Sequence, residues 1–319
     1  MIRILIYLIF VTTGWAHHSP ASAELPPIEF VQIEEGLFAV KDFSNAVFLI
    51  TDDGVLVVDT LIHPERAELM LAEIRRLTDQ PIRWVVNTHA HADHYSGNSV
   101  FLAEGATVVA HRHTAQQIRD LFQFEVGRRT SRLAQVGLDT DDVEKVIPTV
   151  TYDTAMTIEL GDQKIRLMHL GPGQNYGDSL VFFEQAKVLF VGSVFQTGNA
   201  WPNPMMTPSF DGWLDVLNQI KCMDADRYVS GHSRTNVLGN RDDLNASIEL
   251  ITTLHEQVAA AISQGLTENE TVNAVQLEKY TQWRSFKNRE KRVRNVYHLL
   301  STGIPDYFRE AGVPDYRFE

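Results

Sequence analysis

Three histidines and an aspartate lie within six residues of this chain, directly after an apolar run that is typical of a buried strand. The motif is His89-Ala90-His91-Ala92-Asp93-His94, and the run covers residues 82–87. Open α/β sheets place their sites at the carboxyl ends of strands. Imidazole and carboxylate groups are the ligands that zinc prefers outside cysteine-rich sites. Packing alone does not explain such a cluster, because buried ionisable groups need a charge partner or a metal.

The spacing of this motif can serve two metal ions. His89 and His91 are expected to point toward one ion, and Asp93 and His94 toward another. Two other histidines, His111 and His113, form a second H-x-H pattern after an apolar run, which we interpret as a solvated strand end.

The remaining pattern consists of two successive blocks of strands and helices. The turn 52–54 predicts a hairpin, and a proline opens a helical period at 64–77. Expected strands are 30–33, 37–43, 46–51, 55–59, 82–87, 106–110, 156–160, 164–169, 179–184, 188–191 and 227–230; expected helices are 64–77, one from 114, 213–223, 244–264, 268–277 and 286–300. Residues 124–149 read as helix fragments and loop. Two such blocks without a linker predict a sandwich with sheets inside and helices outside.

The first residues resemble an export signal. Arg3 precedes an apolar run at 4–11, and Ala21-Ser22-Ala23 is an A-x-A cleavage site. A transmembrane anchor is the alternative, but the run is much shorter than the roughly 20 residues that span a bilayer. We therefore predict a signal peptide at 1–23, a mature chain at 24–319, and a periplasmic or secreted protein without a membrane segment in its mature form.

Composition restricts the class of partner. Apolar residues make up 44% and charged residues 22% of the 319, as in an ordinary globular protein. Loss of the signal removes the single positive charge of Arg3, so the net charge falls from −13 to −14. This charge argues against nucleic acid and anionic lipid as partners. The one cysteine, Cys222, cannot form an internal disulfide, and we expect it to be a buried small hydrophobe.

Four features, in this order, resemble the metallo-β-lactamase-fold hydrolase superfamily. They are Val57-Val58-Asp59-Thr60, the motif at 89–94, Gly171-Pro172-Gly173-Gln174-Asn175-Tyr176-Gly177-Asp178, and Gly231-His232-Ser233. The resemblance covers about residues 30–235. It implies a four-layer αββα sandwich, an α/β fold in which 24–319 form one domain with the metals at one sheet edge. Residues 240–319 are then a mainly helical C-terminal extension.

The resemblance implies one or two Zn²⁺ per chain, with two departures from the family pattern. His89, His91 and position 174 match the first site, but Gln174 replaces the usual histidine. Asp93, His94 and His232 match the second site. Many members have an Asp that bridges both metals at the position of Ser193. One subclass of zinc β-lactamases has a Ser there, as this chain does. The first site is then weak or empty, completed by Gln174 as a ligand, or completed by another residue such as His169.

The function implied is zinc-dependent hydrolysis of an ester, lactone, lactam or thioester by a metal-bound hydroxide, with a β-lactamase among the candidates. Asp93 would orient the hydroxide, and Asp59 would hold a metal-binding imidazole. Ser193, Asn199 and Trp201 are candidate substrate contacts, with an exposed Trp201 in an apolar wall at 197–206; the alternative is a loop that simply packs. The second hypothesis is a catalytically degenerate single-metal relative that binds a metabolite or partner. A small-molecule substrate is expected, and the oligomeric state stays open.

Overall fold

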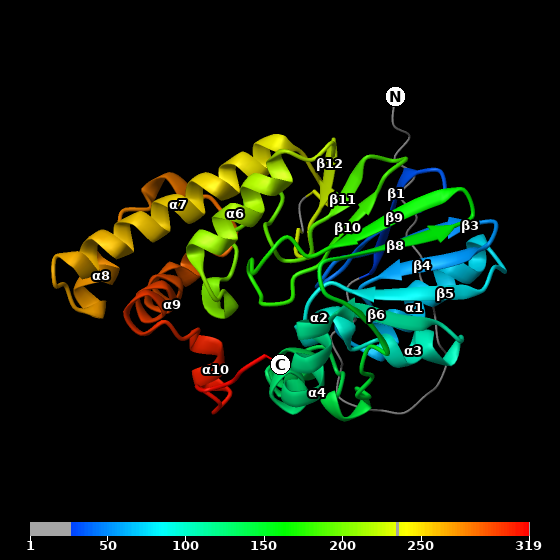
Figure 1. The fold of residues 1–319 in the computed structure, drawn as a ribbon. Coiled ribbons are helices and arrows are strands. Elements are labelled where there is room, and N and C mark those ends of the chain that lie inside the picture. Colours follow the sequence, from blue (N-terminus) through cyan, green and yellow to red (C-terminus); the bar gives the residue numbers. More distant parts are fainter. Residues whose placement is uncertain (1–26, 234–235, 319) are drawn as a thin grey trace.

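Two β-sheets lie face to face in the computed structural model, which describes residues 27–318 except 234–235 (Figure 1). The predicted signal peptide at 1–23 lies outside the described residues. The first sheet contains, in spatial order, β1 (Glu29–Glu34), β2 (Leu37–Lys41), β3 (Ala46–Thr51), β4 (Gly54–Val58), β5 (Ile82–Asn87), β6 (Thr107–His111) and β7 (Val150–Tyr152). Strands β1 to β4 pair antiparallel, and β4 to β7 pair parallel.

The second sheet is shorter and mostly antiparallel. Its spatial order is β13 (Leu238–Gly239), β12 (Arg227–Val229), β11 (Val188–Phe190), β10 (Leu180–Phe183), β9 (Gln163–Met168) and β8 (Ala155–Leu160). Only β11 and β12 pair parallel. Apolar side chains from both sheets, among them Val58, Val86, Ile165 and Phe190, form one core between them. The sandwich predicted from the sequence is therefore confirmed.

Helices cover the outer faces of both sheets. The helices are α1 (Pro64–Leu77), α2 (Ala92–Tyr95), α3 (Asn98–Ala103), α4 (Arg112–Gly127), α5 (Thr130–Ala134), α6 (Phe210–Lys221), α7 (Arg241–Ser263), α8 (Glu268–Ala274), α9 (Arg289–Thr302) and α10 (Asp306–Glu310). Short 3₁₀ turns are η1 (Thr140–Asp142), η2 (Pro204–Met206), η3 (Glu278–Tyr280) and η4 (Phe286–Asn288). Helices α1 and α3 share a core with the first sheet, and α6, α7 and α9 with the second. No helix in the described part of the chain has the length and hydropathy needed to cross a membrane.

Local sequence explains where several helices begin. Pro64 occupies the first turn of α1, where its missing N–H costs no hydrogen bond, and the His63 ring caps the helix by accepting from the Glu65 N–H. Asn240 and Asp243 form a capping box at α7, and Thr267 and Glu270 form another at α8. These caps satisfy N–H groups that would otherwise lack partners in the first turn.

The strand directions decide where a site can form. The carboxyl ends of β4, β5 and β6 meet at one edge of the first sheet because these strands are parallel. Asp59 follows β4 and His89 follows β5 at that edge. In the second sheet, Ser193 and His232 follow the parallel pair β11 and β12. Five separate loops therefore converge between the sheets, counting the β2–β3 turn described below.

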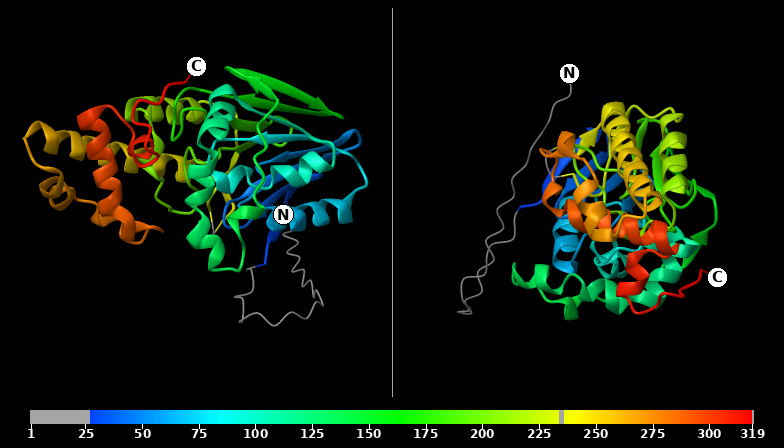
Figure 2. Two further views of the ribbon diagram at one scale, coloured as in Figure 1. Left: turned by 90° about the horizontal axis from the view of Figure 1, so that it is seen from below. Right: turned by 90° about the vertical axis from the view of Figure 1, so that its left-hand side faces the viewer.

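The C-terminal helices gather at one end of the molecule, beyond α6 (Figure 2). Helix α10 returns toward the first half of the chain, where Tyr307 and Phe308 pack with Leu121 of α4 and with Met205 and Met206 of η2. The extension predicted for 240–319 is thus packed on both α6 and α4 rather than standing apart.

The expected burial of Cys222 and exposure of Trp201 were both wrong. Cys222 caps the C-terminus of α6 and is exposed, because the last buried position of the helix is Ile220, two residues earlier. Trp201 is buried, not exposed: its ring packs edge-on against Tyr280 and Phe286, and the Arg292 guanidinium lies 5.4 Å from its centre. The C-terminal helices cover this indole.

Candidate metal centre

Asp93, His94 and His232 form the first candidate donor set. The Nε2 atoms of His94 and His232 lie 3.1 Å apart, and Asp93 Oδ2 lies 3.9 Å from the first and 3.5 Å from the second. His94 Nδ1 donates to Asp59 Oδ2 at 2.7 Å, and His232 Nδ1 faces the Phe43 carbonyl at 3.4 Å. Both Nε2 atoms therefore carry lone pairs, and two facing lone pairs need a cation or a proton between them.

This donor set fits a metal ion. One donor atom from each of the three residues lies within 4.8 Å of the others, and all come from buried or half-buried side chains. Two imidazoles and a carboxylate are a common ligand set for a zinc ion that keeps an open position. The residues predicted for the second metal site are thus brought together, although His232 comes from the loop after β12, 138 positions beyond His94.

His89 and His91 form the second candidate set. His89 Nε2 lies 2.9 Å from His91 Nδ1. Thr88 Oγ1 donates to Asp59 Oδ2 and accepts from His89 Nδ1 at 2.9 Å, so His89 also directs a lone pair toward its neighbour. The geometry is that of two ligands to one ion.

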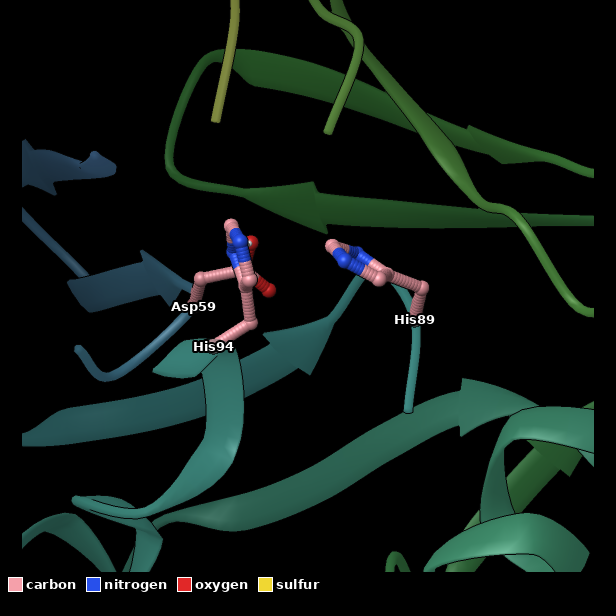
Figure 3. Close-up of side chains that lie close together, drawn as sticks. All are labelled: Asp59, His89 and His94. Carbon is pink, nitrogen blue, oxygen red and sulfur yellow. Dashed lines mark hydrogen bonds and ion pairs between the residues drawn. The ribbon is translucent and has the colours of Figure 1, made fainter. Parts of the chain in front are cut away.

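Asp59 orients imidazoles rather than acting as an open ligand. Its Oδ2 accepts from His94 Nδ1 and from Thr88 Oγ1, and its Oδ1 accepts from the Thr88 N–H at 2.8 Å. Figure 3 shows Asp59 and His94 side by side, with His89 pointing toward the same space. Asp59, His89 and His94 also have donor atoms within 4.8 Å, but the carboxylate is already used. Its backbone has a φ of 61°, a conformation that aspartate tolerates better than most residues.

The protonation states suit metal binding. Burial lowers the pKa of His91 to about 4, the pKa of His232 to about 3, and the pKa of His89 well below its usual value. Burial also lowers the pKa of His94, but the Asp59 carboxylate outweighs it and the net shift is upward. Burial raises the pKa of Asp93, but Arg129 and the imidazoles outweigh it and hold the carboxyl ionised. The cluster thus offers three imidazoles that burial keeps neutral, and His94 paired with Asp59, around an ionised carboxylate.

Glycines allow the loops to approach this closely. A Cβ on Gly231 would lie 2.7 Å from the His94 ring and 3.0 Å from the Gly192 carbonyl oxygen. Gly192 has a φ of 51°, and its Cβ would lie 2.9 Å from Thr88 Oγ1. The β2–β3 turn closes the other side, where Asn45 donates to the carbonyls of Ser230 and Gly231 at 2.7 Å each.

Gln174 is buried, and both the nitrogen and the oxygen of its amide form hydrogen bonds within the protein. Its Nε2 donates to the Asn203 carbonyl at 2.6 Å, and its Oε1 accepts from Asn175 Nδ2. Asp178 in turn accepts from the Asn175 N–H at 2.7 Å. Ligation by Gln174 therefore remains a prediction, and it would need the amide oxygen to use its second lone pair.

The three candidate substrate contacts are placed differently. Ser193 is buried, and its Oγ has no hydrogen-bond partner within the described residues. Asn199 is exposed with a φ of 53°, and its carbonyl accepts from the Arg284 N–H at 3.0 Å. Trp201 is covered by the C-terminal helices, as described above. Trp201 Nε1 also has no partner within the described residues, but it lies under the C-terminal helices, whereas Ser193 follows β11 at the edge where the loops converge.

Two charged residues at this centre were not identified from the sequence. Arg129 Nη2 lies 2.5 Å from Asp93 Oδ1, and Glu125 Oε2 accepts from the Ala92 N–H at 3.1 Å. Both come from the region 124–149 that was read as fragments and loop. The only signal available was the spacing of Glu125 and Arg129, one helical turn apart, which is also typical of a solvated ion pair.

His111 is buried, so the interpretation of a solvated strand end was wrong for it. Its ring stacks on His169 with ring centres 4.0 Å apart and lies edge-on to His113 at 4.8 Å. Its Nε2 donates to the Asp153 carbonyl, and its Nδ1 accepts from the His113 N–H. Both nitrogens are therefore used, which speaks against His111 as a metal ligand.

The buried His111 ring should make stability depend on pH. Burial, followed by the neighbouring His169 and His113, lowers its pKa from 6.5 to about 3. Between these values the unfolded chain binds a proton that the native state does not. The free energy of unfolding should therefore fall as pH falls below 6.5, by up to about 1.4 kcal/mol per unit.

Urea unfolding at pH 7 and pH 5, with a chelator present, measures this slope. The variant His111→Gln should be less stable at pH 7 but show a shallower slope, and His255→Gln on α7 is the control. Equal slopes in His111→Gln and the wild type would show that the ring titrates normally.

The chain belongs to the metallo-β-lactamase superfamily, whose family model matches residues 39–232. The match begins in β2 and ends at His232, so it spans every loop of the candidate centre.

Individual relatives are distant. A linear primary-alkylsulfatase from Pseudomonas sp. is 23% identical over 262 residues, covering 70% of this chain and 48% of the relative. A type 2 metallo-β-lactamase from Elizabethkingia meningoseptica is 20% identical over 244 residues, covering 73% of this chain and 89% of the relative. The chain thus spans about half the length of the alkylsulfatase that it matches.

Solved structures give the same fold. A metallo-β-lactamase from Pontibacter korlensis matches with a TM-score of 0.58 and 21% identity, over 70% of this chain and 99% of that one. The stereoselective inverting sec-alkylsulfatase Pisa1 from Pseudomonas sp. matches with a TM-score of 0.70 and 17% identity, over 87% of this chain and 50% of that one. The alkylsulfatase structure matches 87% of this chain, which is more than the segment 39–232 matched by the family model.

Proposed function

We propose that this protein is a zinc-dependent hydrolase whose metal is held by Asp93, His94 and His232. The observation that carries the proposal is the pair of facing Nε2 atoms, 3.1 Å apart, with an ionised carboxylate oxygen beside them. Buried lone pairs without a donor between them are unfavourable, and a divalent cation satisfies all three groups at once.

The substrate class that we propose is an ester, lactone, lactam or thioester, and we add sulfate esters. β-Lactamases and alkylsulfatases are both among the relatives. The alkylsulfatase likeness covers 87% of the chain against 70% for the lactamase structure, which favours testing sulfate esters early. Fold membership alone does not decide among these substrates.

The residues of the chain have separate parts in this chemistry. When bound, zinc lowers the pKa of coordinated water to about 7 and polarises the bond under attack. Asp93, kept ionised by Arg129 and the imidazoles, supplies the anionic ligand and the acceptor that orients the attacking water. Asp59 keeps the proton of His94 on Nδ1, so that Nε2 stays available as a ligand. His89 and His91 can bind a second ion.

A degenerate single-metal relative that binds a metabolite or partner is the second candidate. The observation that favours it is the engagement of Gln174, whose amide bonds Asn203 and Asn175 instead of completing the His89–His91 set. Catalysis that needs two metals would then fail.

Zinc content after dialysis against trace zinc, followed by a substrate screen, tests the proposal. We expect one tightly held zinc per chain and hydrolysis of at least one ester, lactone, lactam, thioester or sulfate ester. One zinc without hydrolysis of any of them would favour the binding-only candidate, and no bound zinc would refute the metal site.

The variant Gln174→His should strengthen the first metal site. An imidazole is a better zinc ligand than an amide oxygen, so we expect a second zinc to be retained through the same dialysis and a higher turnover rate. Gln276→His, at a position outside the site, is the matched control. An unchanged zinc content in Gln174→His would show that residue 174 does not face His89 and His91.

We also propose that residues 1–23 direct export and are removed. The A-x-A sequence supports cleavage after Ala23. The N-terminal sequence of the protein recovered outside the cytoplasm should begin at Glu24; an uncleaved product would refute the cleavage.

A further inference from the structure

The carboxylate of Asp93 has two oxygens in different surroundings. Oδ2 faces the imidazole pair, 3.5 Å from His232 Nε2 and 3.9 Å from His94 Nε2. Oδ1 faces the opposite way and accepts a hydrogen bond from Arg129 Nη2 at 2.5 Å. The Asp93 side chain is only 2% exposed and that of Arg129 17%, so the guanidinium is a largely covered counter-charge to a buried carboxylate. Asp93 can therefore contact an ion through Oδ2 and Arg129 through Oδ1 at the same time.

Glu125 supports this contact from one helical turn earlier. Its Oε2 lies 3.6 Å from Arg129 Nη2 and accepts from the Ala92 N–H, next to Asp93, at 3.1 Å. Its Oε1 accepts from Arg128 Nη1 at 2.6 Å. One buried carboxylate thus joins the backbone of the metal-binding loop to two arginines at the end of α4.

The far side of the same cluster touches the C-terminal extension. The Arg128 guanidinium lies 5.4 Å from the ring centre of Tyr307 in α10 and 5.6 Å from that of Phe124 in α4. Arg128 Nη2 also lies 3.4 Å from Met205 Sδ in η2. In Figure 1, α4 lies below α2, which carries Asp93, and to the right of α10.

We propose that Arg129, supported by Glu125, is a positioning residue for the metal ligand Asp93. It holds Oδ1 so that Oδ2 alone is directed at the ion, and it balances the charge of Asp93 when the ion is absent. The inference rests on the proposed zinc site at Asp93, His94 and His232. It also gives the C-terminal extension a part in the centre, because α10 packs on the arginine that shares Glu125.

The variant Arg129→Met separates this role from simple packing. Without a metal, it leaves the Asp93 carboxylate buried without its cation, whereas a bound zinc restores a positive partner. The melting temperature should therefore fall more in the metal-free protein than in the zinc-loaded protein. We expect the difference between the two forms to widen by about 5 °C or more relative to the wild type.

Cobalt substitution reports on orientation without any substrate. If Arg129 no longer holds Oδ1, Asp93 is free to turn, and the visible absorption bands of the Co²⁺-loaded protein should change in position or intensity. Arg129→Lys restores a point charge but not the planar fork of donors. It should recover most of the metal-free melting temperature while the cobalt spectrum stays altered.

Arg76→Met is the matched control. Arg76 pairs with the buried Glu73 at 2.7 Å on α1, outside the loops that carry the predicted ligands. This variant should lower both melting temperatures equally and leave the cobalt spectrum unchanged. If Arg129→Met behaved in the same way, the positioning role would be refuted while the zinc site stood. If the wild type bound neither zinc nor cobalt, the proposed metal site would fail first, before any variant is measured.

Discussion

Replacing Asp93 by alanine should lower turnover by more than about a thousand-fold while the protein stays folded. Asp93 is the only carboxylate in the Asp93–His94–His232 set, so its loss removes an anionic ligand and the acceptor for the attacking water. Loss of a single transition-state hydrogen-bond donor in other enzymes already costs about 10²–10³ in rate. Glu125 lies 3.6 Å from the arginine left behind, which limits the damage to the fold.

The measurement is kcat/KM on whichever substrate the screen identifies, with zinc content and circular dichroism on the same samples. The control is Asp224→Ala, which removes an exposed carboxylate paired with Lys187 and should leave all three unchanged. Unimpaired activity in Asp93→Ala would mean that hydrolysis does not proceed through this site.

The variant Asp59→Asn should weaken zinc binding by about 10–100-fold. Asparagine fits the left-handed backbone at this position, so the change is chemical more than structural. An amide that keeps the Thr88 N–H bond through its oxygen turns its NH₂ toward His94 Nδ1, where two donors would meet. His94 then favours the tautomer with its proton on Nε2, which removes the lone pair that binds the ion.

Zinc affinity for Asp59→Asn can be measured by competition with a chromophoric chelator. Glu73→Gln, which changes a buried carboxylate on α1, should bind zinc like the wild type. Wild-type affinity in Asp59→Asn would show that the hydrogen bond to Asp59 does not control the state of His94.

Elements with a strong local pattern were predicted from the sequence to within a few residues. The helix at 64–77 and the strand at 82–87 have the bounds that were predicted, because a first-turn proline marks the start of the helix and the strand is a mainly apolar, β-prone run. The motif at 89–94 could be identified as a candidate metal site from the sequence, since its four groups are neighbours in the chain. Its pairing with His232 came from resemblance, because no local pattern reveals a contact across 138 positions.

The sequence was less informative where burial depends on distant elements. Trp201 looks like an exposed loop residue until α9 and the segment at 280–286 cover it. His111 looks like a solvated strand end until His169, directly after β9, stacks on it. Arg129 looks like an ordinary solvated cation until the fold places Asp93 against it. In each case the deciding neighbour lies far away in the chain.

The turn between β2 and β3 has a consequence for how the centre can assemble. Asn45 bonds the Ser230 and Gly231 carbonyls beside His232, and the neighbouring Ser44 Oγ donates to the Asp93 carbonyl. Residues from the start, middle and end of the sandwich are therefore tied together at the proposed metal site. A chain with only its first sheet formed would hold Asp93 and His94 but lack His232 and the turn's partners. A metal ion can therefore bind all three ligands only after both halves have packed together. The ion would then stabilise the folded sandwich and would not nucleate its folding.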